Sequence, residues 1–462
     1  MEDERKSLEI VKKDLNEVGP GFCAAKWFTS TIWLSNGRTS SCHHPPAHKI
    51  TYDDIKNNPS GLHNTAFKKR VRRDMIMEKR PKECNYCWKV EDSDPNAVSD
   101  RYIKSSCVPW HDVYRNVVDW QRWPEDVLTI TKDSYEKDYN PRILEISFDN
   151  LCNLACSYCN TEFSSTWAND IKKNGKYNNL KTSQRGTFER AVEFDFEPKS
   201  EENIYIKKFF EWFDSGLKED LLELRITGGE PIRSPSFWKL IEKSKDANFK
   251  MSVNSNLIMT QKWLDKLVLA SHQFKDFDVF TSCEAQGEQA DFIRSGLNYK
   301  DWIRNLRYFA ENGKYSGITV MMTINALCLF SITKFLDDIV ELKNEYGRHL
   351  FRLSLNILRF PNFQSVNILP LEIKLRLADD ITDWIKVNKN KIEDGEVINI
   401  ERLVSYLRSV DKSYEDSDSM KDKINDFKQF YSQYSIRKSL PAIEQVFTDQ
   451  DFIEWWDHIQ QE

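Results

Sequence analysis

The sequence lacks any long apolar run. None of its apolar stretches approaches the roughly 18–20 residues that a membrane-spanning helix needs, so we expect no membrane-embedded segment. Its first residues, MEDERKSLEIVKKDL, are charged throughout and cannot form the apolar part of a secretory signal. We therefore expect a cytoplasmic protein, in which the 10 cysteines serve as metal ligands or in catalysis rather than in disulfides.

An excess of basic charge is also missing. The 66 Lys and Arg residues face 72 Asp and Glu residues, and the formal net charge is -6. Both signs are scattered along the chain, which excludes binding of nucleic acid through a general basic field and leaves only a local patch. Internal repeats and low-complexity tracts are absent as well. At 462 residues the chain is long enough for about two to three domains.

Strand-like and helix-like segments alternate from Pro141 onward. Repeated strand–helix units favour a parallel sheet with right-handed crossovers, and six of them suit an open barrel better than a closed eight-fold one. We predict an α/β fold with a partial (β/α)6 TIM-like barrel over 141–360, a small cysteine-rich domain over 1–140 and a helical extension over 361–462. The expected strands are 142–148, 221–227, 249–256, 277–283, 317–325 and 350–358.

Residues 1–140 read as irregular. They contain short apolar pieces, clustered Cys and His, and one possible helix around FKKRVRRDMIMEKR. The sequence shows too little obvious core for this region to fold well without a metal staple.

Three cysteines follow directly after the first expected strand, in NLCNLACSYCN (150–160). Thiolates select zinc or iron–sulfur clusters. A structural zinc site usually has four ligands, and no fourth Cys or His lies nearby in the sequence. A 4Fe–4S cluster held by Cys152, Cys156 and Cys159 alone would keep one iron free to bind a small molecule.

The next expected strand ends in TGGEP (227–231). Gly228 and Gly229 have no Cβ, so backbone groups there can approach a ligand closely at the carboxyl end of a parallel strand. Glu230 can accept a hydrogen bond from an ammonium group. The sequence thus predicts a cluster iron with a free coordination position beside a binding site for an amino-acid-like ligand.

Together these features resemble the radical S-adenosylmethionine (SAM) enzymes. CNLACSYC matches their CxxxCxxC motif, with Tyr158 as the aromatic residue before the third cysteine, and GGEP matches their SAM-amino motif. SNLIM (255–259) is similar to the family's third-strand motif, with Asn256 in register.

The segment TSCEAQGEQADFIR (281–294) is similar to the family's fourth-strand segment. The resemblance implies that Ser282 meets the ribose of SAM and that Arg294 meets its carboxylate. The Asp-Gly pair that the family has after this serine is missing here.

The N-terminal cysteines form a second group. Cys23, Gly37 and Cys42 fit the CX9–15GX4C element of the SPASM and twitch domains, and PKECNYCWKVED supplies Cys84 and Cys87. The resemblance implies that residues 1–140 are a twitch-like domain that holds a second, auxiliary 4Fe–4S cluster.

Alternatives to that cluster remain open. The same four thiolates can form a zinc knuckle, or His43 or His44 can replace Cys84 or Cys87 as a ligand. The other three cysteines are Cys107, Cys283 and Cys328. Cysteines of this kind are usually buried as small hydrophobic residues. Cys283 has a second interpretation, because a thiol beside the expected ribose site could donate a hydrogen atom to a substrate radical.

The resemblance implies reductive cleavage of SAM to a 5′-deoxyadenosyl radical, which abstracts hydrogen from a substrate. Our first hypothesis is modification of a peptide or protein by crosslinking, oxidation or epimerisation, although no leader-binding winged helix is evident. The alternative is a twitch-type dehydrogenase or epimerase of a sugar or aminocyclitol. A third hypothesis is a cluster-bearing sensor. A flavodoxin- or ferredoxin-type protein is the expected electron donor.

Overall fold

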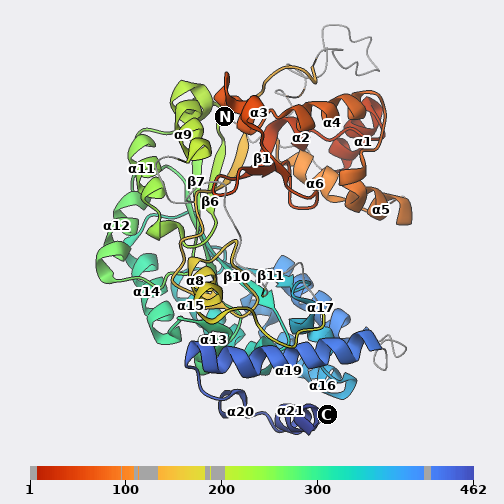
Figure 1. Ribbon diagram of the computed structural model, residues 1–462, viewed down its shortest axis with the longest axis vertical. Helices are drawn as coiled ribbons and strands as arrows, with labels where there is room; N and C mark the ends of the chain where they lie inside the picture. The colour runs from red at the N-terminus through yellow and green to blue at the C-terminus, as the bar shows by residue number, and fades with distance from the viewer. Residues whose placement is uncertain are drawn as a thin grey trace. The chain divides into compact units, whose positions relative to one another are not determined.

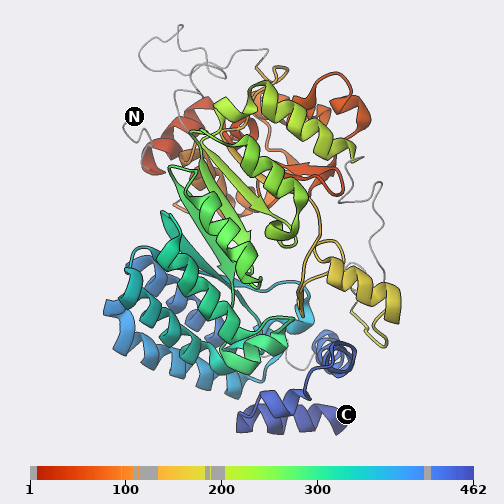
Figure 2. The same ribbon diagram turned by 90° about the vertical axis from the view of Figure 1, so that its left-hand side faces the viewer.

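The computed structural model describes residues 8–94, 96–108, 113, 134–182, 188, 203–409 and 418–461 (Figures 1 and 2). The chain divides into two compact units. The first unit consists of residues 1–149, 194–227 and 239–251, and the second of residues 150–193, 228–238 and 252–462. The domain boundaries expected from the sequence stay predictions.

The first unit contains a mixed sheet with the strand order β6-β4-β1-β2-β3. β1 pairs in parallel with β4, and β4 pairs in parallel with β6. β1 and β2 form an antiparallel hairpin that turns at Gly37, where φ is +61° and a Cβ would lie 2.2 Å from Tyr205 Cζ. The strands are β1 (Thr29–Trp33), β2 (Arg38–Ser40), β3 (His48–Lys49), β4 (Ile143–Ser147) and β6 (Glu223–Thr227).

The N-terminal part of this unit has a hydrophobic core, so the prediction of an irregular region with little core is wrong. Apolar residues of α1 recur three and four positions apart, at Val11, Leu15 and Val18, and all three are buried. They pack with the aromatic residues Trp27 and Trp88. The helices are α1 (Leu8–Val18), α2 (Ala25–Phe28), α3 (Tyr52–Ile55), α4 (Ala66–Ile76), α5 (Asn85–Ser93), α6 (Asp100–Ser106) and α9 (Ile204–Trp212).

In the second unit, β8, β10 and β11 pair in parallel, and β7 joins β8 at the other edge. β7 begins in the first unit, where Lys250 N donates to Leu222 O at 2.8 Å. Figure 1 shows α12 and α14 following one another along one side of these strands. The elements are β7 (Lys250–Ser255), α12 (Gln261–Ser271), β8 (Phe277–Ser282), α13 (Gly287–Ile293), α14 (Tyr299–Asn312), β10 (Gly317–Ile324), α15 (Ile332–Tyr346) and β11 (Phe351–Ile357), with α11 (Pro235–Lys243) before β7.

All six strands expected from the sequence are present, and the α/β fold class with a parallel-strand sheet is confirmed. Side chains alternate as the strand pattern predicts. In β6, Leu224 and Ile226 are fully buried, whereas Arg225 and Thr227 on the opposite face are half-buried. The apolar face of the strand therefore packs into the core.

The region after β11 is helical, as predicted. Figure 1 shows α19 as a long blue helix with α20 and α21 on one side of it. Phe427 of α19 packs against Trp455 of α21, with ring centroids 5.4 Å apart. The helices are α16 (Leu371–Asn388), α17 (Asp394–Arg408), α19 (Asp418–Lys438), α20 (Ile443–Val446) and α21 (Gln450–Gln461). Among the residues that the structure describes, no helix is both long and apolar enough to cross a membrane.

Candidate functional site

The three cysteines of the CxxxCxxC motif lie on residues 150–160, here called the cysteine loop. Cys156 belongs to the short strand β5 (Ala155–Cys156), which pairs antiparallel with β9 (Arg294–Ser295), so that Cys156 lies opposite Arg294. All three cysteines are half-buried. The segment continues into α8 (Ser165–Asn174), whose N-cap is Ser164. The loop is thus fixed at its middle by strand pairing and at its end by a capped helix.

The thiols of the cysteine loop are hard to ionise on their own. Burial raises the pKa of all three, to about 12 for Cys159, and the charge of Cys156 adds to the effect on Cys152 and Cys159. Two N–H groups point at the sulfurs: Leu154 N donates to Cys152 Sγ at 3.4 Å and Arg294 Nη1 donates to Cys156 Sγ at 3.6 Å. Coordination by a metal would make these groups thiolates.

Arg294 is buried, and its charge is paired with Glu284. Its Nε lies 3.1 Å from both carboxylate oxygens and its Nη2 donates to Oε2 at 2.5 Å. Tyr158 OH donates to the same carboxylate at 3.0 Å. Burial lowers the pKa of Arg294, but the charge of Glu284 outweighs this and raises that pKa well above its usual value. Arg294 is therefore a permanent cation beside Cys156, oriented by Glu284.

The GGEP turn touches the cysteine loop directly. A Cβ on Gly229 would lie 2.3 Å from Leu151 O, so glycine is required there. Gly228 has a φ of +116°, which also favours glycine. Glu230 N donates to Leu151 O at 2.6 Å. The two glycines thus let the turn approach the backbone just before Cys152.

The Glu230 carboxylate is enclosed by hydrogen-bond donors. It accepts from Asn256 N at 2.6 Å, from Ser255 Oγ at 2.8 Å and from Ile232 N at 3.4 Å. Burial raises the pKa of Glu230 to about 7. This side chain ties the GGEP turn to the end of β7, and a ligand ammonium would join donors that are already present.

Asn256 connects the end of β7 to the cysteine loop. Its Nδ2 donates to Asn153 Oδ1 at 3.0 Å, and Asn153 Nδ2 donates to Ile258 O at 3.0 Å. The structure therefore gathers Gly229, Asn256 and Arg294 around the cysteine loop. Their contacts with a bound ligand stay predictions.

The donor set of the cysteine loop fits a 4Fe–4S cluster. Within the described residues, no three His, Cys, Asp or Glu side chains are close enough to hold a single metal ion. A cluster binds each thiolate through a different iron, and hydrogen bonds to sulfur help to set its reduction potential. Cys152, Cys156 and Cys159 would hold such a cluster.

The four N-terminal cysteines gather within the first unit. Cys23 precedes α2, Cys42 follows β2, and Cys84 and Cys87 flank the start of α5. Burial raises the pKa of both Cys84 and Cys87 to about 12, and the charges of Cys23 and Cys42 add to it in both cases. Cys23, Cys84 and Cys87 also belong to one buried hydrophobic core, which brings the two halves of the predicted ligand set together.

A buried ammonium lies among these thiols. Lys26 is 4% exposed, and its Nζ lies 3.4 Å from Glu83 Oε1. Burial lowers the pKa of Lys26, but the charges of Cys84, Glu83 and the other thiols outweigh this and raise it. A buried cation offsets the negative charge that nearby thiolates would carry.

The two histidines considered as alternative ligands have other partners. His44 Nε2 lies 2.5 Å from Asp100 Oδ2, and its ring stacks on Tyr86 at 3.7 Å. Burial lowers the pKa of His43, and the charge of Glu145 opposes this shift. The placement of His44 favours a structural role for its ring.

Residues 146–329, which include the cysteine loop, the GGEP turn and Arg294, match the Radical SAM superfamily. This segment is a radical SAM domain. The identification accounts for the three-cysteine donor set and implies that the domain binds a 4Fe–4S cluster and SAM.

Two solved structures show a weak likeness to the chain. SuiB of Streptococcus suis bound to S-adenosylmethionine is 15% identical, with 78% of this chain and 69% of SuiB covered and a TM-score of 0.36. Native anSMEcpe with bound AdoMet and Cp18Cys peptide is 13% identical, with 54% and 62% covered and a TM-score of 0.32. Likeness at this level carries no argument about the substrate. A comparison with curated proteins found no match.

Two polar residues of the radical SAM domain were missed by the sequence analysis. Glu284 holds Arg294, and Asn153 holds Asn256. Glu284 gave no local signal, because Glu288 and Asp291 lie nearer to Arg294 in the sequence. Asn153 gave no signal, because the CxxxCxxC pattern leaves the positions between its cysteines open.

Ser282 and Cys283 lie at the end of β8. Ser282 is the last residue of the strand and is half-buried. Cys283 is fully buried, and its thiol donates to Ala285 O at 3.4 Å. Burial raises the pKa of this thiol. The placement favours packing over hydrogen-atom donation, and the ribose contact of Ser282 stays a prediction.

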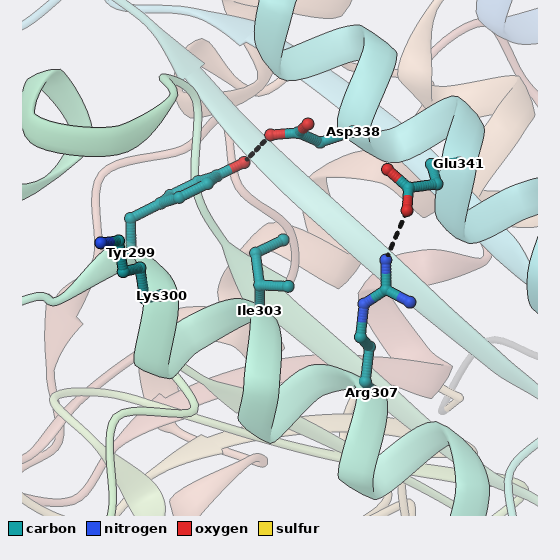
Figure 3. A pocket seen from close by; sticks show the side chains of 6 residues that line it. All are labelled: Tyr299, Lys300, Ile303, Arg307, Asp338 and Glu341. Carbon is teal, nitrogen blue, oxygen red and sulfur yellow. Dashed lines mark hydrogen bonds and ion pairs between the residues drawn. The ribbon is translucent and has the colours of Figure 1, made fainter.

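A pocket of about 320 Å³ lies between α14 and α15. Figure 3 shows Tyr299 reaching Asp338 and Arg307 reaching Glu341 across it. The distances are 2.6 Å for Tyr299 OH to Asp338 Oδ2 and 3.0 Å for Arg307 Nη2 to Glu341 Oε1. None of the predicted site residues lines this pocket.

Proposed function

We propose that the protein reductively cleaves SAM to a 5′-deoxyadenosyl radical that abstracts hydrogen from a peptide or protein substrate. The observation that carries the proposal is the contact of the CxxxCxxC loop with the GGEP turn, inside the segment that matches the Radical SAM superfamily. The 4Fe–4S cluster and SAM supply the radical chemistry when bound, and the chain supplies binding, orientation and exclusion of water.

The residues of the radical SAM domain have separate tasks in this proposal. Cys152, Cys156 and Cys159 hold the cluster. Gly228 and Gly229 let the backbone approach the methionyl part of SAM, and Glu230 accepts from its ammonium. Asn256 supports that part of the site from the end of β7. Ser282 meets the ribose.

Arg294 binds the SAM carboxylate in this proposal. Its Nε and Nη2 are engaged by Glu284, and its Nη1 faces Cys156. A ligand carboxylate would therefore meet a guanidinium whose orientation is already fixed, which lowers the cost of ordering it on binding.

The four N-terminal thiols hold a second, auxiliary 4Fe–4S cluster in this proposal. The buried Lys26 supports an anionic occupant, because burying a cation is favourable only when negative charge lies close to it. The auxiliary cluster would either accept an electron from the substrate radical or anchor the substrate. A flavodoxin- or ferredoxin-type protein in the cytoplasm would reduce the SAM cluster.

A peptide or protein is our first choice of substrate, and the SPASM- and twitch-like spacing of Cys23, Gly37 and Cys42 supports an auxiliary cluster for either substrate class. The reaction would be a crosslink, an oxidation or an epimerisation. Mass spectrometry of peptide and sugar substrates after incubation with SAM and a reductant would choose between this class and the small-molecule alternative.

The basic proposal is tested by iron content and SAM cleavage. Anaerobically reconstituted protein should hold about eight irons if two 4Fe–4S clusters are present. Replacing Cys152, Cys156 and Cys159 together by Ala should halve the iron and abolish 5′-deoxyadenosine, measured by liquid chromatography with mass spectrometry. Full SAM cleavage by that triple variant would refute the proposal.

A matched control is replacement of the exposed Cys107 by Ala. Its thiol donates to Ile103 O at 3.4 Å and has no predicted ligand role. This variant should keep both the iron content and the yield of 5′-deoxyadenosine of the unaltered protein.

A further inference from the structure

Four consecutive backbone carbonyls of the cysteine loop, those of residues 154–157, each accept a hydrogen bond from a buried side chain. All four donor residues are 0% exposed. The pairs are Ser164 Oγ to Leu154 O (2.7 Å), Tyr434 OH to Ala155 O (2.8 Å), Trp167 Nε1 to Cys156 O (2.9 Å) and Gln364 Nε2 to Ser157 O (3.0 Å). A buried carbonyl without a partner is costly, so these side chains fix the backbone around Cys156.

Two of the four donors come from the chain beyond the last barrel strand. Gln364 lies in the short helix η7 (Asn362–Gln364), and Tyr434 lies on α19. The Tyr434 hydroxyl also accepts from Ser295 N at 3.2 Å. One hydroxyl group therefore binds both strands of the β5–β9 pair, which carry Cys156 and Arg294.

The Tyr434 ring is fixed as firmly as its hydroxyl. It stacks on Trp167, with centroids 6.0 Å apart, and on Phe430, with centroids 5.4 Å apart. Trp167 is itself one of the four donors. The ring and the hydroxyl together leave Tyr434 a single position relative to the cysteine loop.

α19 is also fixed to the segment that follows α8. Arg437 donates to Gly175 O at 2.8 Å and to Lys176 O at 2.6 Å. Nearer the start of the helix, the buried Asp426 accepts from Lys181 N at 2.6 Å and from Thr182 N at 2.7 Å. The helix cannot move along the loop without breaking these bonds.

We infer that Tyr434 is a positioning residue for the three-cysteine site, through which α19 sets the placement of Cys156 relative to Arg294. The inference rests on the proposed function only for the identity of the group that the loop binds. A SAM molecule held by a cluster iron and by Arg294 needs both at a fixed separation, and Tyr434 OH is bonded to the backbone of both strands that carry them.

The test compares Tyr434→Phe with Tyr406→Phe in the full chain. The control removes a tyrosine hydroxyl that accepts from Asn367 Nδ2 at 2.9 Å on another helix of the same unit. In metal-free protein, hydrogen exchange read by mass spectrometry should be about tenfold faster in residues 154–159 and 293–296 of Tyr434→Phe, because the variant loses the bonds to Ala155 O and from Ser295 N. The control should exchange like the unaltered protein.

Reconstituted protein supplies the second readout. Tyr434→Phe should keep its iron, while its dissociation constant for SAM rises about fivefold, the effect of about one hydrogen bond. The electron paramagnetic resonance spectrum of the reduced cluster with SAM should also change. Unaltered protein that binds no cluster would refute the proposed function, and the exchange measurement would still decide the present inference.

Unchanged exchange in Tyr434→Phe would overturn the inference. Faster exchange together with unchanged SAM affinity and an unchanged spectrum would also overturn it, because the hydroxyl would then be only a structural bond. If Tyr434→Phe does not fold, Arg437→Met tests the same helix, because it removes the bonds of α19 to Gly175 O and Lys176 O. The same two readouts and the same expected results then apply.

Discussion

Arg294 and Glu284 form a buried ion pair in which each charge compensates the other. At the scale of single residues, this pairing has a practical consequence. Removing one partner leaves an uncompensated buried charge, which is costly by about 3–5 kcal/mol, so loss of SAM binding and loss of stability would occur together in a single variant. Two variants are needed to separate the effects.

Arg294→Met should weaken SAM binding by about 10- to 150-fold, since a hydrogen bond to a charged group contributes about 1.5–3 kcal/mol. It should also lower the free energy of unfolding. The double variant with Glu284→Gln should regain stability and leave SAM binding weak. Calorimetry of SAM binding and urea unfolding measure the two effects.

The control for this prediction is Arg304→Met, which removes an exposed arginine paired with Asp301. It should change neither quantity. Unchanged SAM affinity in Arg294→Met would show that the assignment of the carboxylate contact is wrong.

The raised pKa of Glu230 leads us to expect that the stability of the protein depends on pH. Burial raises its pKa from the ordinary value of 4.5 to about 7, so the folded state binds the proton more tightly than the unfolded state. Between about pH 4.5 and pH 7 its contribution to the free energy of unfolding falls as the pH rises, by about 3 kcal/mol at most. Urea unfolding of metal-free protein at pH 5 and pH 7.5 should show this decrease.

Glu230→Gln should remove that part of the pH dependence, because the amide does not titrate. The same slope in both proteins would mean that the carboxylate titrates near its ordinary pKa. Binding of SAM to Glu230→Gln tests the ammonium contact separately and should fall by about 1.5–3 kcal/mol.

At the scale of elements, the site depends on segments that approach closely rather than on any one strand. The GGEP turn reaches the cysteine loop through Gly229, and α19 reaches it through Tyr434. Both contacts involve backbone atoms of the loop. A change that pushes one of these elements away would therefore shift the cysteines without touching them.

Gly229→Ala tests the first of these contacts. The new Cβ would lie 2.3 Å from Leu151 O, a backbone atom that cannot rotate away, so the turn or the loop must move. We expect a loss of about 1–3 kcal/mol in stability, as for overpacking in a core, and less iron at the three-cysteine site. Thermal unfolding and iron analysis measure these effects.

Gly395→Ala in α17 is the matched control. A Cβ at this position meets no heavy atom within 4 Å, so the substitution should leave stability equal or slightly higher and iron content unchanged. Equal behaviour of the two variants would contradict the importance of the close approach at Gly229.

At the scale of the whole molecule, the two predicted groups of cysteine ligands belong to different units. Replacing Cys84 and Cys87 by Ala should remove about four irons and leave the SAM cluster intact if the first unit holds a cluster. SAM cleavage should then persist while substrate turnover fails. If the site holds zinc, aerobically purified protein should contain about one zinc per chain, and the double variant should lose no iron.

The fold class was predictable because its signal is local. Alternating residues such as Leu224, Arg225 and Ile226 mark a half-buried strand within a few positions of one another. The motifs that carry Cys156 and Glu230 are equally short. What could not be predicted joins distant parts of the sequence: Tyr434 and Ala155 are 279 residues apart, and no pattern within either segment points to the other.

The N-terminal core was missed for a related reason. The first helix has only a few apolar residues between charged ones. Its buried residues Val11, Leu15 and Val18 form a core only together with Trp27 and Trp88. The parallel pairing of β1 with β4 likewise joins segments with different local patterns. Sequence reasoning identified the cysteines of both groups but not the elements that support them.

The pairing of β1 with β4 also sets an order of events during synthesis. β1 leaves the ribosome early and can form its hairpin with β2 at once, but its other edge has no partner until Ile143–Ser147 has been translated. At about 5–20 residues per second, that edge stays open for about 5–20 seconds. Open strand edges can pair with other chains, so nascent copies on neighbouring ribosomes can mispair through this edge of β1.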